Sequence, residues 1–194
     1  MTEERAGLPI LAFADAATLE GWLQAQPASS PGLWIKLAKA GSGIASVTKR
    51  EAVDAALCYG WIDGQLDKYD NEHWLIRLTP RKPRSKWSQV NRTRATELLG
   101  AGRMRPRGLA QVEAAKADGR WDAAYAPASK AEVPADLQAA LNQSPVAAAF
   151  FATLTGANRY AILYRIEAVK KPETRARKIA DFVAMLERHE TVHG

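Results

Sequence analysis

The stretch from residue 51 to residue 91 constrains the fold most, because its hydrophobic period changes within a few residues. Thr48 is followed three residues later by Glu51, which matches a capping box in which each side chain accepts a backbone N–H of the first helical turn. This pattern predicts a helix that begins after Thr48. Gly60 lies where a left-handed residue would end that helix without strain.

Beyond this helix, apolar residues recur at every second position, which is typical of strands. A polar turn at residues 69–71 divides the pattern, so we expect a β-hairpin over residues 61–79. With that turn, Asp63 lies opposite Arg77. The pair is either a surface salt bridge, worth about 0–1 kcal/mol, or an acid and a base that line a pocket beside Trp61.

Residues 80–83 contain two prolines, which keep the next segment out of helices and central strands. Ser85 or Ser88 then caps another helix. Arg81, Arg84 and the first N–H groups of that helix are expected to converge, and such an arrangement attracts anions. A capped helix beside solvated arginines remains the alternative. The candidate ligand-binding residues are Trp61, Asp63, Arg77, Arg81, Arg84, Ser85, Ser88 and Asn91.

Four strings in the chain carry a resemblance to a known family. They are ALCYGWIDGQ at 56–65, RLTPRKPRSKWSQVN at 77–91, GRMRPRG at 102–108 and AVKKPETRARKI at 168–179. These strings resemble the YdeI/OmpD-associated family, also called bacteriocin-protection proteins, over nearly the whole chain. The resemblance implies a cytoplasmic bacterial protein linked to tolerance of bacteriocins, antimicrobial peptides or other stress. It also implies an α+β N-terminal part and a small C-terminal helical module, and it supplies no catalytic residues.

The sequence predicts a protein in two parts, because strand-like spacing gives way to helical spacing along the chain. We expect an α+β domain over residues 1–118, with a small antiparallel sheet flanked by helices. LPILAF at 8–13 and LWIKL at 33–37 are further strand candidates. A linker over 119–132 and a C-terminal helical module over 133–194 complete the chain.

Composition narrows the class of protein. The single cysteine excludes an internal disulfide framework and is typical of a reducing compartment. The longest apolar run, at 145–154, is ten residues long, whereas a membrane-spanning helix needs about 20. Residues 1–7 lack the hydrophobic core of a signal peptide. We therefore expect a cytoplasmic protein that does not span a membrane.

Basic charge is concentrated in residues 77–107, which hold ten basic side chains and one acidic one. The rest of the chain is slightly acidic, although the whole chain has a formal net charge of +6. A block this basic can bind an acidic partner or nucleic acid. Its one aromatic residue is Trp87, so the stacking side chains of a single-strand binder are missing and nucleic acid is disfavoured.

The motifs of metal and nucleophilic chemistry are incomplete. His73, His189 and His193 form no H-E-x-x-H motif and have no cysteine partners in the sequence, so no metal site is predicted. Cys58 lies near the end of the predicted helix, where the helix dipole opposes a thiolate. The glycines at 41–43 lack the lysine of a phosphate-binding loop, and no cofactor is predicted.

Three classes of function follow from these patterns. We expect a non-enzymatic stress or antimicrobial-peptide-tolerance protein that binds a small anionic ligand or a partner within residues 61–91. The second class is an enzyme that uses Asp63 and the neighbouring arginines. The third is a nucleic-acid binder that uses residues 77–107.

Overall fold

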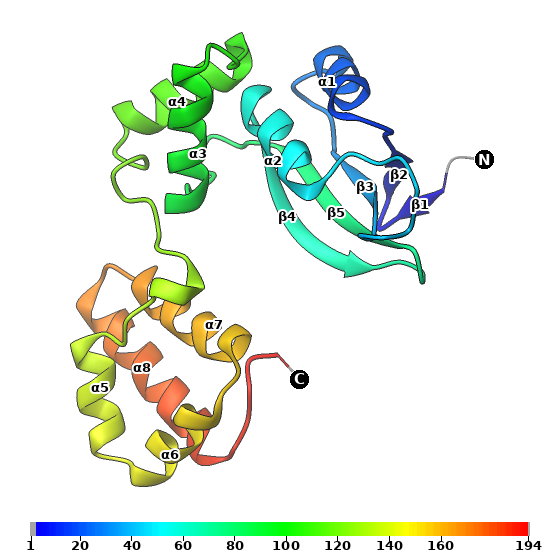
Figure 1. Ribbon diagram of the computed structural model, residues 1–194. Coiled ribbons are helices and arrows are strands. Elements are labelled where there is room, and N and C mark those ends of the chain that lie inside the picture. The colour runs from blue at the N-terminus through cyan, green and yellow to red at the C-terminus, as the bar shows by residue number, and fades with distance from the viewer. Residues whose placement is uncertain (1–2, 194) are drawn as a thin grey trace. The chain divides into compact units, whose positions relative to one another are not determined.

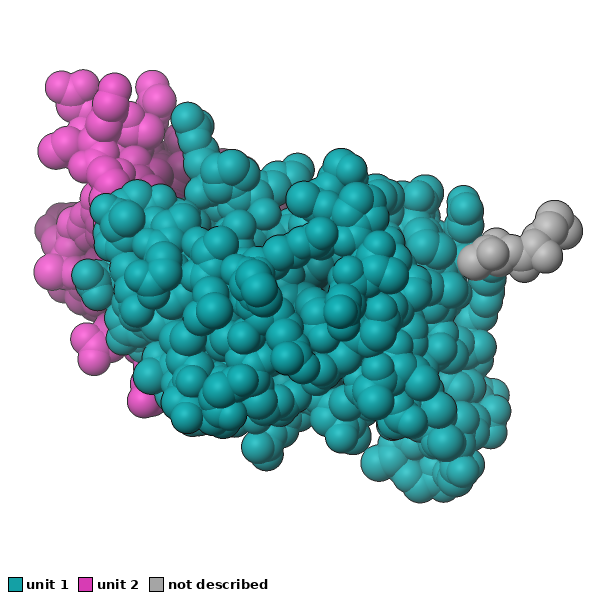
Figure 2. Space-filling view, turned by 90° about the horizontal axis from the view of Figure 1, so that it is seen from above, with its two compact units in different colours: residues 1–125 teal, residues 126–194 magenta. Residues whose placement is uncertain are grey.

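The computed structural model describes residues 3–193, and the chain divides into two compact units, Met1–Tyr125 and Ala126–Gly194 (Figures 1 and 2). Each unit has its own hydrophobic core. The boundary between them falls inside the segment predicted to be a linker. No helix among the described residues is both long and apolar enough to cross a membrane.

The N-terminal unit is built on a sheet whose strand order is β1-β2-β3-β5-β4. Its elements are β1 (Glu4–Arg5), β2 (Leu8–Ala12), α1 (Ala16–Ala25), β3 (Leu33–Ala38), α2 (Lys49–Cys58), β4 (Trp61–Lys68), β5 (His73–Pro80), α3 (Gln89–Gly100) and α4 (Pro106–Ala117). The α+β class is confirmed, but the sheet is mixed rather than purely antiparallel. β2 and β3 run parallel because α1 carries the chain between them as a crossover connection.

The main core lies between the sheet and helices α1 and α2 (Figure 1). Leu33, Ile35 and Leu37 alternate along β3 and point into this core, as the two-residue period of a strand requires. Helices α3 and α4 pack against α2. The opposite face of the sheet carries a smaller cluster around Trp34, whose indole N–H donates to the carbonyl of Arg5 at 3.0 Å.

Helix α2 begins and ends as its sequence predicts. Thr48 and Glu51 form a complete capping box, in which each side chain accepts the backbone N–H of the other residue. Gly60 follows the helix with φ +78°, a left-handed conformation that costs glycine little. Its carbonyl accepts the backbone N–H of Arg81 at 3.0 Å, so the end of α2 fixes the start of the segment that follows β5.

The β4–β5 hairpin contains a bulge between Asp63 and Leu66. Asp63 pairs with Leu78, whereas Leu66 pairs with Ile76, so two residues of β4 lie opposite Arg77. The predicted pairing of Asp63 with Arg77 is therefore wrong. The predicted turn at residues 69–71 is also too short, because Lys68 pairs with Trp74. Because directly paired residues share a face of the sheet, Asp63 lies on the face of the core residue Leu78.

All regular elements in the described part of the C-terminal unit are helical. They are the short 3₁₀ helix η1 (Ala128–Lys130) followed by α5 (Ala135–Asn142), α6 (Pro145–Thr153), α7 (Gly156–Glu167) and α8 (Pro172–Glu187). Ser144 caps α6 by accepting the N–H of Ala147, and Pro145 occupies the first turn. The expectation of a C-terminal helical region is confirmed.

Candidate functional site

Arg81 is the basic side chain that the fold buries. It follows β5 directly, and its residue is only 6% exposed. Its Nη1 donates to the carbonyl of Lys86 at 3.2 Å. No carboxylate among the described residues lies within ion-pair distance of it. Asp54, the other buried charge in the described part of the chain, differs because Arg94 donates to both of its oxygens, at 2.6 and 2.5 Å.

Two further nitrogens of Arg81 have no hydrogen-bond partner among the residues that the structure describes. Its Nε and Nη2 are buried without a hydrogen bond, and so is the indole Nε1 of Trp87. These three atoms are the buried side-chain nitrogens or oxygens without a partner in residues 3–193. The guanidinium carbon of Arg81 lies 3.6 Å from the centre of the Trp87 ring, so all three donors belong to one stacked pair. The pair offers donors and no acceptor, which suits an anion.

Burial lowers the pKa of Arg81 to about 10, while the negative charge of Asp63 opposes this shift and the positive charge of Arg120 adds to it. At neutral pH the side chain is therefore still a cation. A buried cation is stable only if charges or hydrogen bonds compensate for its lost hydration. Among the described residues, this compensation comes from one hydrogen bond, the face of Trp87 and the charge of Asp63.

Asp63, Ser88 and Asn91 meet at the start of α3. Ser88 caps the helix by accepting the backbone N–H of Asn91 at 3.0 Å. The side-chain amide of Asn91 donates to Asp63 at 3.1 Å. The structure therefore brings together three of the residues predicted for the site, and their carboxylate acts electrostatically on Arg81.

The other predicted site residues lie apart from this group. Arg77 and Arg84 are exposed to solvent. Trp61 is buried in the main core, where its ring packs edge-on against Trp22 with centroids 5.8 Å apart. Ser85 closes its own turn, since its hydroxyl accepts the backbone N–H of Lys82 at 2.9 Å, and Ser88 caps the helix instead.

The segment at 118–125 contacts the candidate site, although none of its residues was among the predicted site residues. The ring of Trp121 lies edge-on to that of Trp87 with centroids 4.8 Å apart, and Arg120 donates to the carbonyl of Ser85 at 2.8 Å. The backbone N–H of Tyr125 donates to the carbonyl of Trp87 at 3.0 Å. Two aromatic residues in an otherwise polar segment were the signal that could have identified this contact.

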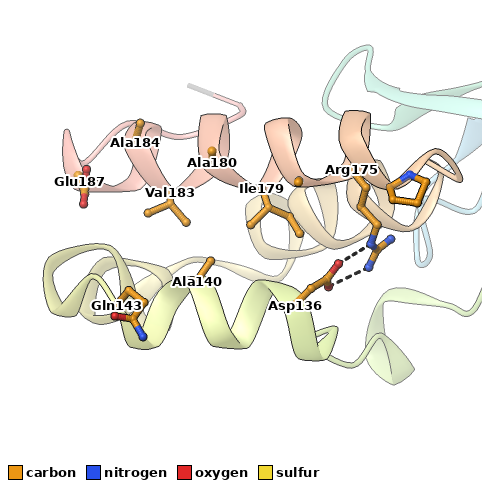
Figure 3. Close-up of a pocket in the computed structure, with 11 residues that line it drawn as sticks. Asp136, Ala140, Gln143, Arg175, Ile179, Ala180, Val183, Ala184 and Glu187 are labelled. Carbon is orange, nitrogen blue, oxygen red and sulfur yellow. Dashed lines mark hydrogen bonds and ion pairs between the residues drawn. The ribbon is translucent and has the colours of Figure 1, made fainter.

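The C-terminal unit has a groove of about 620 Å³ between α5 and α8 (Figure 3). At one end, Arg175 donates to both oxygens of Asp136, at 2.6 and 3.0 Å, and these bonds lower the pKa of Asp136. At the other end, Glu187 accepts the hydroxyl of Ser144 at 2.7 Å. Small and apolar side chains such as Ala140 line the middle. Because both carboxylates have partners, neither of them requires a ligand.

No group of three potential metal ligands comes together among the residues that the structure describes. Burial raises the pKa of the Cys58 thiol, so the neutral thiol prevails at neutral pH.

Comparison with known families gives two matches. Residues 11–111 match the model described as Domain of unknown function (DUF8412), and residues 130–189 match the model described as Bacteriocin-protection, YdeI or OmpD-Associated. The resemblance to the second family is thus confirmed over its matched span, which includes the string at 168–179. The strings at 56–65, 77–91 and 102–108 fall in the span of the other model, so the resemblance predicted over nearly the whole chain is confirmed for residues 130–189 alone. Searches of curated proteins and of solved structures return no significant match.

Proposed function

From the premise that this chain belongs to the DUF8412 family and ends in a region that matches the bacteriocin-protection model, we propose that it is a cytosolic, non-enzymatic tolerance protein. In this proposal, its N-terminal unit binds a small anionic ligand at Arg81. The match over residues 130–189 supports the link to bacteriocin or antimicrobial-peptide tolerance. The single cysteine supports a reducing location.

The observation that carries the binding proposal is the buried Arg81 guanidinium with two donors that have no partner. Burying a charge costs several kcal/mol by order of magnitude, and an anion offsets this cost. A charge-assisted hydrogen bond contributes about 1.5–3 kcal/mol. Association costs at least about 4 kcal/mol in lost freedom of motion, so three such bonds leave at most about 5 kcal/mol, which corresponds to a dissociation constant of roughly 0.2 mM or weaker.

Binding without turnover is the better-supported form of this proposal. The Asp63 carboxylate, which would be the acid or base of an enzyme, already accepts a hydrogen bond from Asn91. The thiol of Cys58 is buried and its pKa is raised, which disfavours a nucleophilic thiolate. Ser88 is engaged in capping α3.

Anion titrations of three proteins test the proposal: wild type, Arg81→Ala and Arg84→Ala. Arg84 is the matched control because it is an exposed arginine in the same segment. We expect chloride, acetate, phosphate or sulfate to raise the melting temperature of wild type and of Arg84→Ala by the same amount. In Arg81→Ala the rise should be smaller or absent. Circular dichroism verifies that each variant is folded.

A measurement on wild type alone covers the case in which Arg81→Ala fails to fold. The Nε–H resonance of Arg81 is expected to shift during the titration, because that proton gains an acceptor. If no anion shifts this resonance at tens of millimolar, or if folded Arg81→Ala binds as tightly as wild type, the binding proposal is wrong.

A further inference from the structure

The unpartnered donors of Arg81 lie along one edge of its guanidinium group. Nη1 donates to the carbonyl of Lys86, whereas Nε and Nη2 have no partner. In a planar guanidinium, the N–H bonds of Nε and Nη2 run parallel along the same edge and form a two-pronged donor. This fork fits the two oxygens of a carboxylate, and also two oxygens of a phosphate or sulfate.

The number of donors distinguishes between these anions. The stacked Arg81 and Trp87 side chains offer three buried donors between them. A carboxylate presents two oxygens and a single charge, which three donors can satisfy. A phosphate dianion or sulfate presents four oxygens, and each buried oxygen left without a donor costs about 1–3 kcal/mol or more.

The charge beside the fork favours a monoanion as well. Asp63 lies close enough to raise the pKa of Arg81, so its carboxylate also repels an incoming anion. This repulsion is about twice as large for a doubly charged anion as for a singly charged one. Asn91 donates a hydrogen bond to this carboxylate at 3.1 Å.

Building on the proposed function, we infer that the ligand at Arg81 is a small monocarboxylate, bound side-on by the Nε and Nη2 edge next to the indole N–H of Trp87. Both donors of the fork are buried, so the carboxylate enters when the surrounding side chains move. The apolar rings of Trp87 and Trp121 beside the site favour a carboxylate with an apolar substituent.

The test compares acetate and benzoate with phosphate and sulfate at constant ionic strength, using the Arg81 Nε–H resonance of the full chain. We expect the two carboxylates to move this resonance downfield with saturation. Phosphate and sulfate should bind at least about tenfold more weakly, which corresponds to the loss of one charge-assisted hydrogen bond.

Arg81→Lys tests whether the preference depends on the two parallel N–H donors or on the positive charge alone, because lysine keeps the charge but cannot form two parallel hydrogen bonds. This variant, followed by the fluorescence of its tryptophans, is expected to lose the preference for carboxylate over phosphate. Arg77→Lys is the matched control, since Arg77 is an exposed arginine of β5, and it should keep the preference.

The outcomes separate this inference from the proposed function. If anions bind at Arg81 but phosphate or sulfate binds as tightly as acetate, the carboxylate inference is wrong and anion binding stands. The carboxylate inference is also wrong, with anion binding intact, if folded Arg81→Lys keeps the wild-type preference. If wild type binds no anion but Asp63→Asn does, Asp63 itself occupies the fork in solution, and both the inference and the binding proposal are overturned. If neither protein binds an anion, both are again overturned.

Discussion

Replacing Gly108 by alanine should strongly destabilise the N-terminal unit. Gly108 lies in the first turn of α4, where that helix meets the last turn of α2. A Cβ atom at this position would lie 2.2 Å from the carbonyl oxygen of Cys58 and 2.7 Å from that of Leu57. Real Cβ atoms essentially never approach another heavy atom closer than 3.0 Å, so the two helices would have to separate.

The cost follows from which atoms must move. The atoms in contact are backbone carbonyls, which cannot rotate away as a side chain can. The Cys58 carbonyl also accepts the backbone N–H of Arg105 at 3.0 Å, a bond worth about 1 kcal/mol that a shift of α4 would strain. Overpacking costs about 1–3 kcal/mol or more, and the better helix propensity of alanine returns at most about 1 kcal/mol. We expect a net loss of about 2–4 kcal/mol for Gly108→Ala.

Urea denaturation followed by tryptophan fluorescence measures this loss, because all six tryptophans lie within residues 1–125. Gly21→Ala is the matched control. Gly21 lies within α1, and a Cβ there would have no heavy atom within 4 Å. That variant should gain about 0.5–1 kcal/mol. If Gly108→Ala is as stable as wild type, α4 does not approach α2 this closely.

Two further predictions concern ion pairs. Asp54→Ala should cost about 2–4 kcal/mol in urea denaturation, because it leaves the partly buried Arg94 without its bidentate partner. Asp118→Ala removes an exposed carboxylate from its pair with Arg120 and should cost much less. Equal losses would contradict this reasoning. In the C-terminal unit, the bonds from Arg175 lower the pKa of Asp136, so this pair contributes stability above the unfolded pKa of about 3.9 and loses it as pH falls through the lowered folded pKa. In Asp136→Asn, the melting temperature of the helices, followed by circular dichroism, should therefore fall less steeply as the pH is lowered than it does in wild type. The same dependence on pH in both proteins would contradict the assignment.

Signals that act within a few residues were predictable from the sequence. The capping box of Thr48 and Glu51, the cap at Ser144 and the left-handed Gly60 each depend on short-range backbone geometry, and each is present. The capping alternatives at Ser85 and Ser88 were left open, since either hydroxyl can accept a local N–H. In the structure, the hydroxyl of Ser85 accepts the backbone N–H of Lys82 in the turn at residues 82–85, and Ser88 is the residue that caps α3.

The hairpin register was not predictable, because one extra residue reverses the alternation of side chains. Leu78 and Ile76 lie on the same face of β5. Before the bulge, the odd-numbered residues Trp61 and Asp63 lie on that face of the sheet, and after the bulge the even-numbered Leu66 lies on it. A strict period of two cannot describe both halves of β4. Gly64 lies within the bulge, and an isolated glycine in a strand pattern is the local signal of such an irregularity.

The bulge also determines which charges meet at the candidate site. Without the bulge, the register that pairs Leu66 with Ile76 would place Asp63 opposite Thr79, on the same face of the sheet as the exposed Arg77. The bulge instead turns Asp63 towards Asn91 on α3, where its carboxylate acts on Arg81 without forming an ion pair. Arg81 is in turn fixed by contacts outside its own turn: its backbone N–H donates to Gly60, and its guanidinium lies over Trp87, whose ring meets Trp121 edge-on. The local sequence, a basic turn between two prolines, does not indicate that Arg81 is buried. The burial of Arg81 and its unpartnered donors follow from tertiary contacts, so they could not be predicted from the sequence.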